Sequence, residues 1–118
     1  MVVGLALVCF AGLVLVGLGW LSLIGRLQRN GFAGIRTPFT MHSDENWAET
    51  HRAAAPLLIF GGVAILMAGL AFLPFAVIGR LGDSLLAAVT LALTVVLVAD
   101  VLIAWQFGVR KAKAALGN

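Results

Sequence analysis

Hydrophobic positions along the chain fall into three long runs, at about residues 2–24, 53–78 and 85–107, separated by two polar stretches. Each run exceeds the roughly 18 consecutive apolar residues that indicate a membrane-spanning helix. At ~1.5 Å per residue, the first run reaches about 35 Å, which is enough to cross a bilayer with some tilt. The pattern predicts an all-α membrane protein in which residues 1–118 form a single domain with three transmembrane helices.

The two polar stretches differ in length and character. Residues 79–83 form a short connection flanked by glycines, which predicts that the second and third spans make an antiparallel hairpin. Residues 26–52 carry four of the eight Lys/Arg, three of the five Asp/Glu and both His of the chain. Because almost everything else is apolar, the chemistry that distinguishes this protein is expected in this polar loop.

Local signals within the polar loop predict a helix from about Asp44, which either lies at the cytoplasmic interface or extends the second span inward with a bend at Pro56. Ser43 is a suitable N-cap, and two acids follow it directly, where the positive end of a helix favours them. On such a helix Trp47 and His51 share one face at i, i+4. Glu49 and Arg52 are spaced to pair at i, i+3.

Small residues and prolines shape the expected spans. Pro56 and Pro74 predict a kink or a shortened second helix. Small side chains permit close helix approach in membranes. We expect such packing along one glycine series and two alanine pairs: Gly12, Gly17 and Gly19; Ala64 and Ala68; Ala88 and Ala92.

Composition supports the membrane assignment. The chain is 62% hydrophobic and 11% charged, with a mean hydropathy of +1.09, whereas soluble domains have roughly 25% charged residues. The net charge of +3 is expected to reflect orientation and contact with anionic lipid rather than nucleic-acid binding. Cys9 is the single cysteine, so the chain has no intrachain disulfide.

The distribution of basic residues predicts the orientation of the protein. One side of the membrane would hold the polar loop and the C-terminal tail, and the other side would hold Arg80 alone. The residues on the first side are Arg26, Arg29, Arg36, Arg52, Arg110, Lys111 and Lys113. We expect a multi-pass protein of the bacterial cytoplasmic membrane, with its N-terminus outside and its C-terminus in the cytoplasm.

The polar loop also carries a spaced set of residues that resembles a known family. An N-x-x-x-G-x-R-T-P-x-T segment joins two spans and is followed by S-x-x-x-W and a nearby His-Arg. This pattern is similar to the signature of the SdpI family of bacterial membrane proteins. The matching residues are Asn30, Gly34, Arg36, Thr37, Pro38, Thr40, Ser43, Trp47, His51 and Arg52. The resemblance implies a role like that of the family's named member, a longer protein that confers immunity to a secreted killing peptide and signals by holding a repressor at the membrane.

Two readings of the polar loop stay open at this point. The Arg36 guanidinium is suited to bind a lipid phosphate, a peptide carboxylate or an acidic side chain of the loop. Alternatively, Arg36 and Trp47 anchor the loop to helix ends and headgroups, as interfacial Arg and Trp usually do.

The sequence contains no motif that is typical of a metal site or of an enzyme. Imidazole and carboxylate groups occur together in the loop, but no H-x-x-x-H or H-E-x-x-H spacing is present. No nucleophile triad, Walker loop or dinucleotide fingerprint occurs either. We expect no metal, no cofactor and no catalysis by this chain alone.

Asp100 is the one acid inside a predicted span. A carboxylate at that depth costs roughly 2.5–3.5 kcal/mol, so it is a functional candidate facing helices, water or a partner. The alternative is that Asp100 reaches the interface or pairs with Arg26, Arg36 or Arg110.

Two functions from different classes follow. The first is an SdpI-like immunity or signalling protein that acts through residues 30–52, with a peptide toxin or regulatory protein as partner. The second is an accessory subunit of a larger membrane complex, such as a transporter, a respiratory assembly or a cell-envelope enzyme. A homo-oligomeric pore would rest on Asp100 alone. Membrane lipids are expected partners in every case, and nucleic acid in none.

Overall fold

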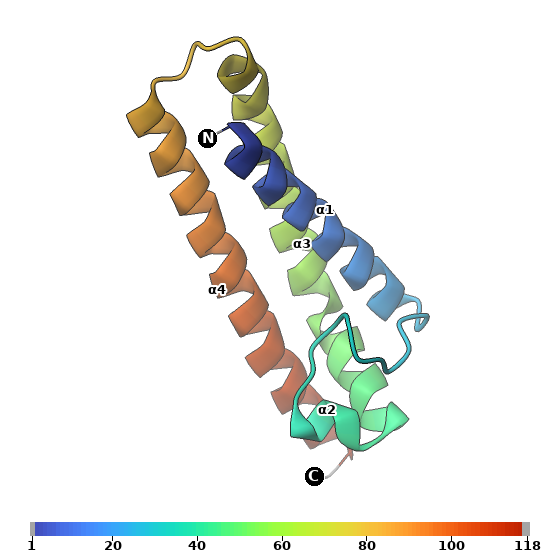
Figure 1. Cartoon of the computed structure of the whole chain (residues 1–118). Helices are drawn as coiled ribbons and strands as arrows, with labels where there is room; N and C mark the ends of the chain where they lie inside the picture. The colour runs from blue at the N-terminus through green and yellow to red at the C-terminus, as the bar shows by residue number, and fades with distance from the viewer. Residues whose placement is uncertain (1, 117–118) are drawn as a thin grey trace.

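The computed structural model describes residues 2–116 and contains four helices. They are α1 (Val2–Leu23), α2 (Pro38–His42), α3 (Asp44–Val77) and α4 (Asp83–Leu116). Three of them, α1, α3 and α4, are long and apolar enough to cross a membrane, which confirms the predicted all-α, three-span class. Figure 1 shows these three side by side in an elongated bundle, 53 × 21 × 21 Å in extent, with α2 at one end.

Helix α3 is the centre of the bundle. It packs extensively against both α1 and α4, whereas α1 and α4 make few contacts with each other. The end of the bundle that holds α2, called the loop end below, is also where α4 finishes (Figure 1). The opposite end, called the hairpin end, holds the start of α1 and the connection between α3 and α4.

Glycines set the distance between α1 and α3. A Cβ on Gly12 would lie 3.0 Å from the Gly62 carbonyl oxygen, and one on Gly19 would lie 3.1 Å from the Ala55 carbonyl oxygen. The backbones therefore approach more closely than larger side chains would allow. Nothing lies within 4 Å of a Cβ at Gly17. The alanine pairs predicted to pack do not take part in this contact. Ala64, Ala88 and Ala92 are exposed within this chain.

The long helices extend beyond the apolar runs. Helix α3 begins at Asp44, capped by the Ser43 hydroxyl, and continues through Pro56 and Pro74 to Val77. Helix α4 continues to Leu116, so the basic residues near the C-terminus lie on its last turns. The first turns of α3 and the last turns of α4 thus form a polar extension of the bundle at the loop end.

Two small cores stabilise the bundle. At the hairpin end, Leu5, Ala76 and Leu86 are buried together. At the loop end, the cluster contains Leu15 of α1, Ala54 and Leu58 of α3 and Ala104 of α4, and it includes a loop residue, Ile35. Most other large apolar side chains are exposed, as expected for a surface that faces lipid. The burial of Ile35 shows that the polar loop contributes one residue to this core.

Candidate functional site

The loop between α1 and α2 folds back along the bundle. Ile35 packs with Leu15, which lies eight residues before the end of α1 at Leu23. Eight helical residues span about 12 Å, so this part of the loop lies beside the helix rather than beyond its end. Figure 1 shows the same return of the chain toward the bundle. At membrane depth, non-helical backbone must be buried in protein or line a cavity, with its polar groups satisfied.

His51 supplies the main connection between α3 and the returning loop. Its Nε2 accepts a hydrogen bond from the Ile35 N–H at 2.8 Å, and its Nδ1 lies 2.8 Å from the Trp47 carbonyl oxygen. These partners define the neutral tautomer, in which Nδ1–H donates and Nε2 accepts. Burial lowers the pKa of His51 below its ordinary value of 6.5, because desolvation disfavours the imidazolium, although the bond to Trp47 opposes this shift.

Trp47 of α3 also contacts the loop. Its side chain is 1% exposed and stacks on the His51 ring, with 4.2 Å between centroids. The indole N–H donates to the Leu27 carbonyl at 2.8 Å. Gly34 crosses over both rings with a φ of +107°, and a Cβ there would lie 2.7 Å from His51 Nε2. Glycine is required at this position for both its conformation and its size.

A turn at Asn30 reverses the chain before it reaches His51. The Asn30 Oδ1 accepts hydrogen bonds from the Phe32 and Ala33 N–H groups, both at 2.8 Å, which is the pattern of an Asx turn. Arg29 lies on the outer side of the loop, where its guanidinium donates to the Met41 carbonyl and pairs with Asp44 at 3.3 Å.

Helix α2 is an element that the sequence analysis did not predict. Thr37, extended at φ −124° and ψ 166°, caps it in a reciprocal box with Thr40, and Pro38 occupies its first turn. The Thr40 hydroxyl also donates to the Ile35 carbonyl at 2.8 Å. The spacing Thr-Pro-x-Thr is a readable start signal for a helix, since Pro favours the first position and a capping hydroxyl precedes it.

The start of α3 follows the local signals. The Ser43 hydroxyl accepts from the Asn46 N–H at 3.0 Å. Glu49 and Arg52 pair at 3.2 Å on the surface, where such a pair adds little stability.

A cavity of about 370 Å³ lies against this loop. Residues 34–37 line it from the loop, and His51 and Leu58 line it from α3. Its remaining walls are Leu15 and Leu18 of α1 and Val101, Leu102 and Trp105 of α4. These apolar wall residues carry no sequence signal, because any residue of a span can be apolar. The cavity is the gap between α1 and α4, closed behind by α3 and bounded at one end by the loop.

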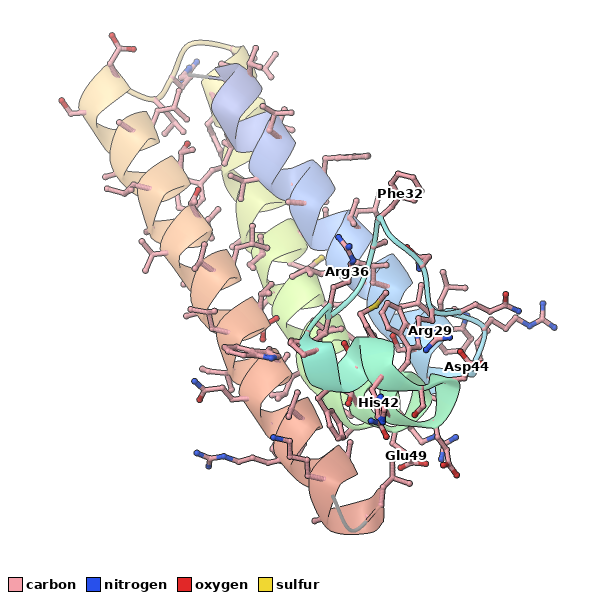
Figure 2. All side chains as sticks on the ribbon, turned by 60° about the horizontal axis from the view of Figure 1, so that its bottom comes forward. Arg29, Phe32, Arg36, His42, Asp44 and Glu49 are labelled. Atoms are coloured by element: carbon pink, nitrogen blue, oxygen red, sulfur yellow. The ribbon has the colours of Figure 1, made fainter. Side chains whose placement is uncertain are left out.

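Arg36 is the charged residue of the cavity lining. Its side chain is exposed, and it forms no ion pair or side-chain hydrogen bond within residues 2–116. Figure 2 shows Arg36 apart from Arg29 and Asp44, which lie next to each other. The other polar side chains of the signature, from Asn30 to Arg52, each bond to neighbouring groups of the loop or of α3. The signature therefore builds a scaffold that leaves one guanidinium available.

Asp100 lies apart from this cavity. Its carboxylate packs on Gly61 of α3, where a Cβ would overlap it, and its Oδ2 is buried without a hydrogen-bond partner in the described part of the chain. No ion pair joins it to Arg26, Arg36 or Arg110 across residues 2–116.

The arrangement suits binding. Over the described range, no group of three or more His, Cys, Asp and Glu comes together as a metal site would require. Both nitrogens of His51 are engaged by backbone groups, so its imidazole is not positioned to exchange a proton with a bound molecule.

Comparison with known proteins identifies the family. A family model described as the SdpI/YfhL protein family matches residues 26–107. No curated protein and no solved structure matches the chain. Since the family match covers more than half of the sequence, the chain belongs to the SdpI/YfhL protein family, and the resemblance noted from its loop signature is confirmed.

Proposed function

We propose that this member of the SdpI/YfhL family is a non-catalytic binding protein of the membrane, with an immunity or signalling role exercised through residues 30–52. One observation carries the proposal. Among the signature residues, Arg36 is the one whose charged group has no partner within residues 2–116, and it lines a cavity. A guanidinium held ready by a rigid loop is an anion-recognition element.

The rigidity of the loop supports a receptor-like role. Ile35, Thr37 and Thr40 are linked through backbone and hydroxyl groups, and His51 ties them to α3. A binding site that is formed in advance does not have to be ordered when its ligand arrives, which favours affinity. Occupation of the cavity would change contacts between α1, α4 and the loop, which gives a route for a signal.

We place the protein in the bacterial cytoplasmic membrane, with the loop end in the cytoplasm. The arrangement of the helices supports this placement, because the basic segments around Arg26–Arg52 and Arg110–Lys113 lie at the same end of the bundle (Figure 1). Positive residues gather on the cytoplasmic side of membrane proteins.

A killing assay tests the proposed function. Cells lacking the gene are challenged with candidate secreted killing peptides and complemented with the parent protein, Arg36→Ala, Trp47→Ala or Arg26→Ala. We expect the parent and Arg26→Ala to protect, and Arg36→Ala and Trp47→Ala to lose protection at equal membrane abundance. Arg26→Ala is the matched control, since it removes the same charge from an exposed position that does not line the cavity. Equal sensitivity of all strains to every peptide would exclude the immunity role.

An accessory-subunit role is favoured by a different observation. Helix α4 is largely uncovered within this chain, and its exposed face carries Ala88 and Ala92. Small residues on a membrane helix allow another helix to approach closely. Purification of the natively expressed, C-terminally tagged protein in mild detergent, followed by mass spectrometry, tests this role. A stoichiometric large partner would establish a subunit, whereas recovery of the protein alone would exclude one.

A further inference from the structure

We propose that the cavity beside Arg36 binds a membrane-derived anionic amphiphile, with its phosphate or carboxylate head on Arg36 and its alkyl chain between α1 and α4. The inference rests on the proposed function, since it names the class of ligand that the loop would recognise. It is carried by the composition of the cavity wall, by the charges around the cavity and by the position of its opening.

The cavity has the size and the two-part lining that such a ligand needs. Its volume of about 370 Å³ falls within the roughly 300–1,000 Å³ of small-molecule sites. Leu15, Leu18, Leu58 and Leu102 give it an apolar wall, and Arg36 is the charged group in its lining. An alkyl chain from the bilayer packs against these leucines by van der Waals contact, as it does against lipid tails, and it has no hydrogen bonds to lose.

The sign of the head group follows from the charges around the cavity. No Asp or Glu lines it. Asp44 pairs with Arg29 and Glu49 pairs with Arg52, and none of these four residues lines the cavity. The Arg36 guanidinium therefore lacks a counter-charge, and a phosphate or carboxylate would accept two parallel hydrogen bonds from it.

The position of the cavity favours a ligand that comes from the bilayer. The wall residues Leu15 and Leu18 lie in the second half of α1, inside the predicted span. On the other side, Leu102 and Trp105 of α4 are 49% and 37% exposed on the surface that would face lipid. Because α1 and α4 make few contacts with each other, an alkyl chain can enter between them sideways from the membrane.

The lining of the cavity favours an alkyl chain over a peptide. A bound peptide needs partners for its own N–H and C=O groups at this depth. The Ile35 N–H and C=O are bonded to His51 and Thr40, and the Thr37 N–H and C=O are bonded to Thr40 and Met41. Gly34 and Arg36 have no such hydrogen bonds within residues 2–116, but the walls from α1 and α4 are apolar and offer a peptide no further carbonyl or amide partners, whereas an alkyl chain requires none.

Fluorescence quenching by brominated lipids tests the inference directly. Trp105 lines the cavity, Trp47 is buried under the loop, and Trp20 is 57% exposed away from the cavity lining. Trp20→Phe protein is therefore reconstituted in phosphatidylcholine vesicles that contain a small equal fraction of brominated phosphatidylcholine, brominated phosphatidylglycerol or brominated fatty acid. Bromine in the cavity quenches Trp105 beyond the quenching by bulk lipid at its exposed surface, and brominated phosphatidylcholine measures that bulk contribution. A second variant, Trp20→Phe with Trp105→Phe, retains Trp47 as its one tryptophan, and its emission maximum reports whether the loop remains folded.

We expect one or both anionic brominated compounds to quench Trp105 more strongly than brominated phosphatidylcholine at the same fraction. Arg36→Gln should lower that preference about tenfold, the scale of one lost hydrogen bond to a charged group. Arg36→Lys should retain part of it, because the charge remains but the planar fork is lost. Arg26→Gln should leave it unchanged, since it removes an equal charge outside the cavity.

The outcomes separate the possible sources and the two proposals. Preference for phosphatidylglycerol alone identifies a phospholipid, and preference for the fatty acid alone identifies a free carboxylate; both support the inference. Equal quenching by all three compounds overturns the inference. An equal loss of the preference for anionic compounds in Arg36→Gln and Arg26→Gln also overturns it. Arg36-dependent protection in the killing assay, together with equal quenching, would overturn this inference while the proposed function stands.

Discussion

The Ile35 N–H donates to His51 Nε2 across sixteen positions of sequence, at 2.8 Å. This hydrogen bond joins a loop residue at the level of Leu15 to the polar start of α3, and it requires a neutral imidazole. The geometry of the cavity depends on it, because residues 34–37 form one of the cavity walls.

Replacing His51 by alanine should loosen the loop and lower the Tm of the protein in detergent. The substitution leaves the Ile35 N–H buried without its acceptor, at a cost of about 1–3 kcal/mol, and it also removes the stack on Trp47. His42→Ala is the matched control, because His42 is exposed at the end of α2. Thermal unfolding followed by tryptophan emission measures both variants, and an unchanged Tm for His51→Ala would refute the anchoring role.

Acidification should weaken the same contact. The pKa of His51 is lowered by burial in the folded state, so below its ordinary value of 6.5 the unfolded loop takes up a proton more readily than the folded one. The stabilisation is fully present above pH 6.5 and is lost as the pH falls from 6.5 toward the folded-state pKa. Protonation of His51 at Nε2 would also convert this acceptor into a donor, so that two N–H groups would face each other and the hydrogen bond from Ile35 would be lost. Protease cleavage in residues 30–37, followed over this range, should accelerate in the parent and in His42→Ala, but not in His51→Ala. A flat profile in the parent would contradict the assignment.

Gly34→Ala should disrupt the loop, while Gly31→Ala should not. At Gly34 the φ of +107° strains any L side chain, and a Cβ would lie 2.7 Å from His51 Nε2 and 3.0 Å from the Trp47 ring. Strain of this kind costs roughly 1–3 kcal/mol before the clash is added. At Gly31 nothing lies within 4 Å of a Cβ, so this position controls for the loss of glycine flexibility. The test compares the two Tm values and, with Trp20 and Trp105 both replaced by Phe, the emission maxima of Trp47; equal behaviour of the two variants would count against a tightly packed Gly34.

Local features of this protein were readable from its sequence, and long-range ones were not. The three spans follow from apolar run length, and the Ser43 cap and the Glu49–Arg52 pair involve residues three apart. The Ile35–His51 bond joins residues that no periodicity relates. The signature of the family marked the polar loop, but the apolar walls of its cavity, such as Leu15 and Trp105, look like any other residues of a span.

Helix packing shows the same limit. The sequence offers several small residues, and a small-xxx-small spacing does not say which face meets a neighbour. Gly12 and Gly62 pack at the α1–α3 contact, whereas Ala88 and Ala92 lie on an exposed face of α4. The choice depends on which helix faces are free once α3 is at the centre, and that is a property of the whole bundle.

A double-mutant cycle at Gly61 and Asp100 should reveal a strong coupling between α3 and α4. Gly61→Ala alone should lower the Tm, because its Cβ would overlap the Asp100 carboxylate. Asp100→Ala alone should maintain or raise the Tm, since it removes a carboxylate whose Oδ2 is buried without a partner in residues 2–116. In the Asp100→Ala background, Gly61→Ala should be tolerated, giving a coupling energy of about 0.5–3 kcal/mol, the range for residues in direct contact. Gly17→Ala, with nothing within 4 Å of its Cβ, is the control for a glycine change in a span. Additive effects at Gly61 and Asp100 would show that the two residues do not meet in the membrane, and a loss of stability in Asp100→Ala would show that the carboxylate has a partner there.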